Sequence, residues 1–198
     1  MSDRVILASA SASRAHLLSA AGVPFTAIAT HVDEDAVKSS MKAEGATAID
    51  CAEALAELKA VKISQAHRDV LVIGADQMLE CEGRWFDKPP SVEAARAHLV
   101  ALSGRTHTLP TAVVVARNGA RIWQHRAVPK LSMRTLTPAF LETYLAQAGK
   151  AVLSSVGAYQ LEGSGVQLFQ AVDGDFFTIL GLPMLPLLSF LQIGRAHV

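Results

Sequence analysis

The stretch Val70-Leu71-Val72-Ile73-Gly74-Ala75-Asp76-Gln77 specifies the fold of this chain. Its first four residues are bulky and apolar and do not alternate with polar residues, which predicts a strand buried on both faces. Gly74 would let another backbone or a ligand approach the strand closely. Asp76 and Gln77 then lie at the carboxyl end of the strand, where open α/β sheets hold their ligands. The alternative is a strand followed by an ordinary solvated turn.

The composition is that of a globular protein with one domain over residues 1–198. Hydrophobic residues make up 51% of the chain and charged residues 18%, which excludes a disordered chain. Lys+Arg and Asp+Glu each count 18, so the formal net charge is zero. Because a nucleic-acid-binding domain usually carries a basic excess or a basic stripe, we expect no nucleic-acid partner.

The cysteines and the apolar runs indicate a cytoplasmic protein. Cys51 and Cys81 lie far apart and match no zinc or redox spacing, so we expect two reduced thiols. The apolar run from Phe176 to Ile193 is interrupted by prolines and a glycine, which excludes a clean membrane span. We therefore expect no membrane partner.

The first loop has the geometry of a phosphate-binding turn. An expected strand over Arg4–Ala8 leads into the serine-rich turn Ser9–Ser13 and then Arg14, and a helix is expected from near Ala15 to Gly22. A strand, a turn of small residues and a helix start offer free backbone N–H groups to a phosphate, and arginine suits phosphate well. The alternative is ordinary, because serine side chains cap helices routinely.

Acidic residues and lysines further along the chain are the next candidates for binding a metal ion or an anion. Asp33–Asp35 could form a solvated loop, or could supply a carboxylate to a magnesium site. An expected helix over Cys51–Ala66, with Asp50 and Glu53 as a capping pair, places Lys59 on one apolar stripe and Lys62 on another. A lysine on such a stripe usually extends to water, but its ammonium could also reach an anion. The spacing does not choose between the two lysines.

The rest of the chain predicts hairpins alternating with strand–helix units, hence a mixed α/β fold. Lys38–Ala48 shows no clear period. The remaining expected elements are a hairpin turning at Glu82-Gly83, a helix over Ser91–Leu102, a strand over Thr108–Ala116, a hairpin at Asn118-Gly119, returning strands over Arg121–Leu136 bent near Pro129, a helix from Pro138 to Gly149, a strand over Val166–Val172 and a C-terminal helix after Gly181.

Seven short segments, in order along almost the whole chain, resemble the Maf family of nucleotide pyrophosphatases. They are Leu7-Ala8-Ser9-Ala10-Ser11 with Arg14 and Leu17-Leu18, Asp33-Glu34, Leu55-Ala56 with Lys59-Ala60, Gly74-Ala75-Asp76-Gln77, Asp87-Lys88-Pro89, Ser103-Gly104-Arg105 with His107, and Gly181-Leu182-Pro183. Each segment is short, and their shared order and compatible spacing make the resemblance specific.

The resemblance implies a fold and a reaction. The fold is a mixed twisted sheet flanked by helices, in a two-lobed single domain with an active-site cleft, as in Maf and Ham1 proteins. The reaction is cleavage of a nucleoside triphosphate between its α and β phosphates, giving a nucleoside monophosphate and pyrophosphate. The resemblance also implies a divalent metal (Mg or Mn), a homodimer, and a role in clearing modified or surplus nucleotides.

The resemblance assigns roles to eight residues and selects Lys59 over Lys62. Asp76 would be the base that orients or deprotonates the attacking water, and Glu34 would hold the metal together with Asp76. The residues implied to bind substrate are Ser9, Ser11, Arg14, Lys59, Gln77 and Lys88, with Gln77 contacting the substrate or a metal-bound water.

Two places depart from the family pattern. The first loop commonly carries a proline and a second arginine, whereas this chain has Ala12 and leaves Arg14 alone. One phosphate contact would then be missing, or supplied by another cation: Lys38, Lys62 or Arg105. Ser154-Ser155-Val156 stands where the family often has Asp-Lys-Ala, which weakens any transfer of site residues from that region.

The nucleobase and the reaction class are left open by the sequence. Gln77 and the Glu162-Gly163 pair resemble the branch associated with 7-methyl-GTP more than the dTTP/UTP branch. A phosphomonoesterase could use the same acids and lysines. The sequence is also compatible with a binding or regulatory protein that inhibits septum formation, and with a family member whose catalysis is weak or lost.

Overall fold

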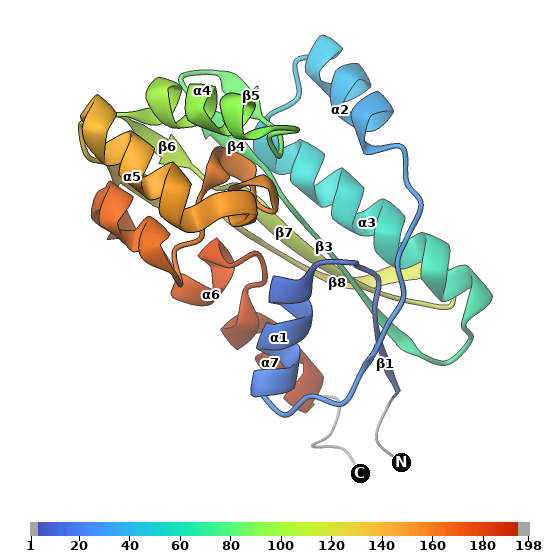
Figure 1. Ribbon diagram of the computed structural model, residues 1–198. Coiled ribbons are helices and arrows are strands. Elements are labelled where there is room, and N and C mark those ends of the chain that lie inside the picture. Colours follow the sequence, from blue (N-terminus) through green and yellow to red (C-terminus); the bar gives the residue numbers. More distant parts are fainter. Residues whose placement is uncertain (1–3, 194–198) are drawn as a thin grey trace. The chain divides into compact units, whose positions relative to one another are not determined.

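The computed structural model describes residues 4–193 and divides the chain into two compact units. The first unit combines Met1–Gln77, Thr111–Ala127 and Phe176–Val198, and the second combines Met78–Pro110 and Val128–Asp175. Each unit holds its own sheet and its own helices (Figure 1). The predicted mixed α/β class is confirmed, although two sheets are present where one was expected.

The first unit is built on a mixed five-stranded sheet of order β2-β1-β3-β7-β8. The neighbours β2, β1 and β3 run parallel, whereas β7 and β8 are antiparallel additions. The strands are β1 (Val5–Leu7), β2 (Thr26–Ala27), β3 (Leu71–Gln77), β7 (Thr111–Arg117) and β8 (Ala120–Ala127). The predicted strand over residues 70–77 is therefore confirmed as the centre of the sheet.

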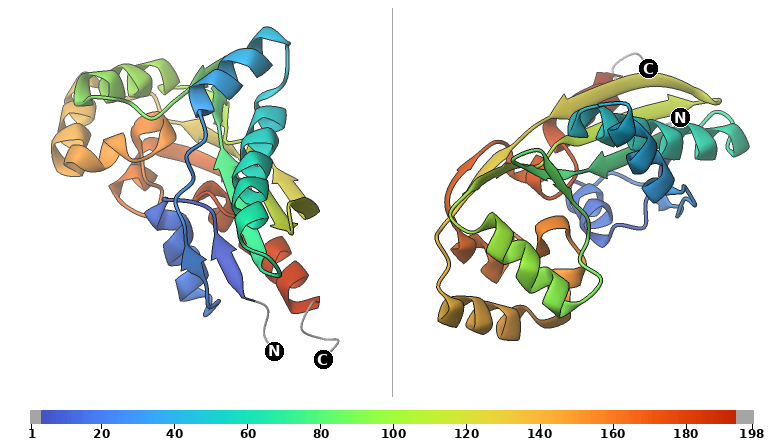
Figure 2. Two further views of the ribbon diagram at one scale, coloured as in Figure 1. Left: turned by 90° about the vertical axis from the view of Figure 1, so that its right-hand side faces the viewer. Right: turned by 90° about the horizontal axis from the view of Figure 1, so that it is seen from above.

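Both faces of β3 are covered by helices, which is why its apolar residues do not alternate with polar ones. Leu71, Ile73 and Ala75 pack into a core with α1 (Ala12–Ala20) and α7 (Met184–Ile193). The opposite face carries Gly74 and lies against α3 (Ala48–Ala66). Figures 1 and 2 show α3 running along the strands of this sheet, apart from α1 and α7.

Two helices of the first unit begin earlier than expected. Ser11 caps α1, which starts at Ala12 rather than near Ala15. Thr47 caps α3 in a reciprocal capping box with Asp50, so the expected pair of Asp50 and Glu53 is wrong.

A further helix, α2 (Glu34–Ala43), occupies part of the segment that showed no period. Asp33 caps it by accepting a hydrogen bond from the Ala36 N–H. None of the residues of α2 is buried, so its sequence carries no buried apolar stripe that could reveal it. A last short helix of the unit, α6 (Phe176–Ile179), precedes Gly181.

The second unit holds an antiparallel sheet of order β10-β9-β6-β4-β5. Its strands are β4 (Leu79–Cys81), β5 (Arg84–Phe86), β6 (Thr106–Thr108), β9 (Lys130–Met133) and β10 (Phe169–Asp173), and its helices are α4 (Val92–Leu102) and α5 (Pro138–Ala148), with short 3-10 turns at Gly149–Leu153, Val156–Ala158 and Ser164–Leu168. The hairpin at Glu82-Gly83 and both helices confirm the expectations from the sequence.

Two expected strands are corrected in this part of the chain. The strand expected over Thr108–Ala116 divides at Leu109-Pro110 into β6 and β7, which belong to different sheets. A proline has no N–H for a sheet ladder, so the strand ends there. The strand expected from Val166 starts only at Phe169, after a 3-10 turn.

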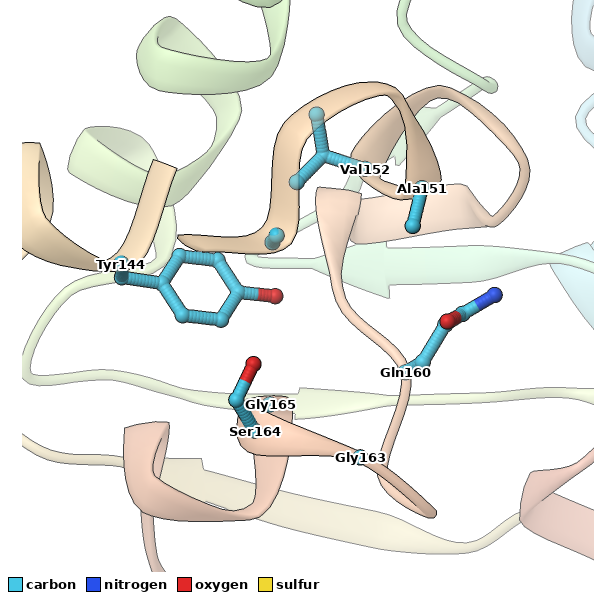
Figure 3. Close-up of a pocket in the computed structure, with 8 residues that line it drawn as sticks. Tyr144, Ala151, Val152, Gln160, Gly163, Ser164 and Gly165 are labelled. Carbon is cyan, nitrogen blue, oxygen red and sulfur yellow. The ribbon is translucent and has the colours of Figure 1, made fainter. Parts of the chain in front are cut away.

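A small cavity of about 50 Å³ lies in the second unit between α5 and the 3-10 turns (Figure 3). Tyr144, Gln160 and Ser164 are among the residues that line it. Ligand pockets for drug-sized molecules usually measure about 300–1,000 Å³, so this cavity has room for water but not for a nucleotide.

Within residues 4–193, no helix combines the length and the apolar content needed to cross a membrane.

Candidate active site

Gly74 allows α3 to approach β3 closely enough to bring two buried charges together. A Cβ at Gly74 would lie 2.2 Å from the Ala56 carbonyl oxygen and 2.8 Å from the Ala60 nitrogen. Asp76 lies two residues further along the strand and so projects from the same face. Lys59, next to Ala60 on α3, thereby comes within reach of the Asp76 carboxylate.

The ammonium of Lys59 bridges two carboxylates. Its Nζ atom lies 2.6 Å from Asp76 Oδ1 and 2.7 Å from Glu34 Oε1. Lys59 and Asp76 are each only 6% exposed, whereas the side chain of Glu34, in the first turn of α2, is 41% exposed. The predicted metal ligands Glu34 and Asp76 are therefore together, and Lys59 stands between them.

The electrostatic environment favours the charged form of Glu34. Burial alone would raise the pKa of Glu34, but the hydrogen bond and the charge of Lys59, assisted by Lys38 and Arg14, hold it below its usual value. Burial lowers the pKa of Arg14, while the charges of Asp76 and Glu34 oppose that effect. The cations Lys59, Lys38 and Arg14 thus favour the charged form of Glu34 at this edge of the sheet.

Arg14 ties the first loop to two other segments of the same unit. Its Nη1 donates to the Ala75 carbonyl at 2.8 Å and to Ser9 Oγ at 3.4 Å. Its Nε donates to the Gly181 carbonyl at 2.9 Å. These contacts use Nε and Nη1, so the Nη2 amino group is the part of the guanidinium left for a substrate phosphate.

The two serines predicted to bind substrate form hydrogen bonds within the first loop. Ser11 Oγ accepts from the Arg14 N–H at 3.4 Å and caps α1, so the alternative of a helix cap is confirmed for this residue. Ser9 Oγ accepts from the Ser11 N–H at 3.1 Å. Both oxygens act as acceptors in these bonds, which leaves each hydroxyl hydrogen able to donate to a phosphate.

Gln77 makes contacts that the sequence did not suggest. Its Nε2 donates to Thr111 Oγ1 at 2.9 Å and to the carbonyls of Thr178 and Ile179 at 3.0 and 3.2 Å. Its carbonyl oxygen is therefore the part of the side chain that could contact a substrate. Sequence reasoning missed the turn over residues 178–181 as an anchor, although the Gly181-Leu182-Pro183 motif marks its position.

Three further candidate cations are Lys88, Lys62 and Arg105. Lys88 belongs to the second unit, in the segment between β5 and α4, and its phosphate contact stays a prediction. Lys62 is exposed and donates to the His31 carbonyl at 2.5 Å. Arg105, also in the second unit, pairs with Glu82 at 2.5 Å.

The two bridged carboxylates fit a magnesium or manganese ion that also has a phosphate ligand. Their oxygens converge on one point, which Lys59 Nζ now occupies. Among the described residues, no group of three or more His, Cys, Asp or Glu side chains could hold a metal ion. Mg²⁺ commonly takes one or two carboxylates and completes its shell with water and substrate phosphates, so a two-carboxylate site matches such an ion.

The site therefore combines what phosphoryl transfer needs: a carboxylate to orient a water, and cations and hydroxyls to stabilise charge on phosphate oxygens.

Known proteins similar to this chain agree with that chemistry. "Nucleoside triphosphate pyrophosphatase" of Rhodospirillum rubrum is 56% identical over 95% of this chain and 93% of its own length. A protein of the same name from Granulibacter bethesdensis is 54% identical over 98% of both chains. "7-methyl-GTP pyrophosphatase" of Rhizobium meliloti is 47% identical over 97% of this chain and 96% of its own length. The family model described as "Maf-like protein" matches residues 4–193, and the chain belongs to this family.

Proposed function

We propose that this protein is a nucleoside triphosphate pyrophosphatase. It cleaves between the α and β phosphates, releases a nucleoside monophosphate and pyrophosphate, and clears modified or surplus nucleotides. The observation that carries the proposal is the cluster of Asp76, Lys59 and Glu34 beside Arg14 at the carboxyl end of β3. The names of the relatives support the same class, a hydrolase acting on phosphoric anhydrides.

Each side chain of the cluster has a role in this reaction. Asp76 orients the attacking water and accepts its proton as the bond to phosphorus forms. Arg14 and Lys59 bind phosphate oxygens and stabilise the negative charge that develops on them. Ser9 and Ser11 donate their hydroxyl hydrogens to the same phosphates.

A divalent cation, Mg or Mn, would be held by Glu34 and Asp76. When bound, such an ion acts as a Lewis acid on phosphate oxygens and neutralises part of the triphosphate charge. The convergence of the two carboxylates on one cationic group supports this assignment.

The nucleobase is proposed from the names of the relatives and from the resemblance of Gln77 and the Glu162-Gly163 pair to the branch associated with 7-methyl-GTP. Relatives named for 7-methyl-GTP are 45–47% identical, and relatives whose names give no base are 52–56% identical. We favour 7-methyl-GTP over dTTP and UTP as the substrate.

The test is pyrophosphate release from a panel of nucleoside triphosphates that includes dTTP, UTP and 7-methyl-GTP. Each is measured with Mg²⁺, with Mn²⁺ and with a chelator. Metal-dependent release of pyrophosphate from one or a few of them is expected. Release of orthophosphate alone would point to a phosphomonoesterase, and silence across the whole panel would contradict the proposed reaction.

The homodimer and the cytoplasmic location stay predictions. Light scattering of the purified protein at several concentrations tests the first, with twice the mass of one chain as the expected result.

A further inference from the structure

Lys59 occupies the point that the proposed cation needs. Its Nζ lies 2.6 Å from Asp76 Oδ1 and 2.7 Å from Glu34 Oε1. An octahedral Mg²⁺ ion binds oxygen at about 2.0–2.1 Å. An ion on these two oxygen atoms would therefore overlap the ammonium group, and the two positive charges would also repel each other.

We propose that in the metal-free protein Lys59 holds the place of the divalent cation and is displaced when that cation binds. The inference rests on the proposed function for the identity of the site. The side chain of lysine is suited to such a movement, because it is a compact charge on a flexible stem of four carbons. Its two positions would be the bridge between the carboxylates and a contact with the substrate phosphates.

The local charges predict that binding of the cation is coupled to binding of the triphosphate. Glu34, Asp76, Lys59, Arg14 and the nearby Lys38 together carry a net charge of plus one. A divalent cation raises this sum to three positive charges, which only an anionic ligand neutralises. The cation should thus bind weakly to the protein alone and far more tightly together with a triphosphate. The displaced ammonium adds to this coupling, because it is then free to bind the phosphates.

The first experiment measures Mn²⁺ binding to the free protein by the electron paramagnetic resonance signal of unbound Mn²⁺. Lys59→Met keeps most of the length of the side chain and removes the competing charge. We expect this variant to bind Mn²⁺ about tenfold or more tightly than the wild type, since one adjacent charge of like sign disfavours a second charge on this scale. Equal or weaker Mn²⁺ binding by a folded Lys59→Met variant would overturn the proposal.

Lys62→Met is the matched control on the same helix. Lys62 contacts the His31 carbonyl and neither carboxylate, so its loss should leave Mn²⁺ affinity unchanged. A non-hydrolysable triphosphate analogue should then tighten Mn²⁺ binding strongly in the wild type and less in Lys59→Met. If Lys62→Met tightened Mn²⁺ binding as much as Lys59→Met, a general effect of surface charge would explain the result, and the proposed displacement of Lys59 would be rejected.

A second measurement uses the wild type alone, because removal of Lys59 leaves two adjacent carboxylates unpaired and could unfold the chain. Acetic anhydride modifies exposed lysine amines, and mass spectrometry reports the rate at each site. Addition of Mn²⁺ without the triphosphate analogue should raise the acetylation rate of Lys59 several-fold. The acetylation rate of Lys62 should stay unchanged. A Lys59 rate that does not respond to Mn²⁺ would contradict the displacement.

Both measurements are made without turnover of substrate. They therefore test the displacement of Lys59 independently of the proposed pyrophosphatase reaction. Displacement of Lys59 by Mn²⁺ together with silence across the nucleotide panel would keep this inference and reject the reaction. Pyrophosphate release with Lys59 unresponsive to Mn²⁺ would keep the reaction and reject the inference.

Discussion

Asp76 is a nearly buried carboxylate that forms an ion pair with Lys59. It also lies near Arg14. Buried ion pairs contribute little net stability on average, because desolvation offsets the attraction between the charges. We therefore interpret this pair, at the end of the central strand, as serving the candidate site rather than stability.

Asp76→Asn tests the proposed base at the level of one atom. The amide cannot accept the proton of the attacking water, and general bases contribute about 10²–10⁴-fold to rates. We expect pyrophosphate release to fall by about 100-fold or more. Wild-type turnover in this variant would show that the mechanism is wrong.

Asp69→Asn is the control, in the turn that precedes the opposite end of β3. Asp69 has a φ of 56°, a conformation that asparagine also tolerates. Asn118 Nδ2 donates to Asp69 Oδ1, an acceptor that asparagine retains. This variant should keep full activity, and circular dichroism should show both variants folded.

His107 predicts a loss of stability in mild acid. It is 1% exposed, its Nε2 lies 2.7 Å from Tyr159 Oη, and its Nδ1 has no hydrogen-bond partner among the described residues. Burial lowers the pKa of His107 to about 4. Between this value and the unperturbed pKa of about 6.5, the unfolded chain binds a proton that the folded chain does not. The contribution of the buried, neutral His107 to the free energy of unfolding is therefore fully present above pH 6.5 and is lost as the pH falls towards 4.

The measurement is urea unfolding at pH 7 and at pH 4.5. The His107 contribution to the change is on the order of 3 kcal/mol over the whole interval from pH 6.5 to 4. His107→Gln cannot be protonated, so its free energy of unfolding should fall less between the two pH values than that of the wild type. An equal fall in both proteins would assign the acid sensitivity to other groups.

At the scale of elements, the packing of α3 on β3 sets the distance between Lys59 and Asp76. Gly74→Ala would place a methyl group 2.2 Å from the Ala56 carbonyl oxygen, so helix and strand must separate. We expect the free energy of unfolding to fall by about 1–3 kcal/mol or more. Activity should fall as well, because the separation moves Lys59 away from Asp76.

Gly163→Ala controls for the chemical change itself. A Cβ at Gly163 would meet the Gln160 carbonyl oxygen at 3.8 Å, an ordinary contact, and the backbone there is extended. Urea unfolding should give nearly the wild-type free energy for this variant. If the two alanine variants were equally stable, close approach of α3 would not be what requires glycine at position 74.

At the scale of the whole molecule, the first unit is assembled from three segments that are far apart in the sequence. Gln77 joins all three, because its Nε2 donates to Thr111 and to the carbonyls of Thr178 and Ile179. Arg14 adds a second link by donating to the Gly181 carbonyl. The candidate site thus depends on the C-terminal segment being held in place.

Gln77→Glu tests these links with almost no change of shape. A carboxylate would face two carbonyl oxygens where an amide nitrogen donated, and unsatisfied buried groups cost about 1–3 kcal/mol each. We expect urea unfolding to show a loss of this size. Gln124→Glu, an exposed position on β8, should change stability little. Similar stability of Gln77→Glu and the wild type would argue against this anchoring role.

Local patterns in the amino-acid sequence were enough to specify several elements. An unbroken apolar run predicted the central strand, Thr137 and Pro138 predicted the start of α5, and Asn118-Gly119 predicted a hairpin. Family motifs, read in order, also selected Lys59 over Lys62, and the structure places Lys59 beside Asp76. Local signals suffice for the strand, the helix start and the hairpin because their causes lie within a few residues.

Which groups meet one another depended on the tertiary structure. The bridge from Lys59 to Asp76 joins residues 17 apart, and the bond from Gln77 to Thr178 joins residues 101 apart. The expected strand over residues 108–116 was divided between two sheets, and α2 formed without a buried stripe. These outcomes depend on partners that are distant along the chain. A local pattern specifies the faces of an element, whereas the contacts between elements specify what each face touches.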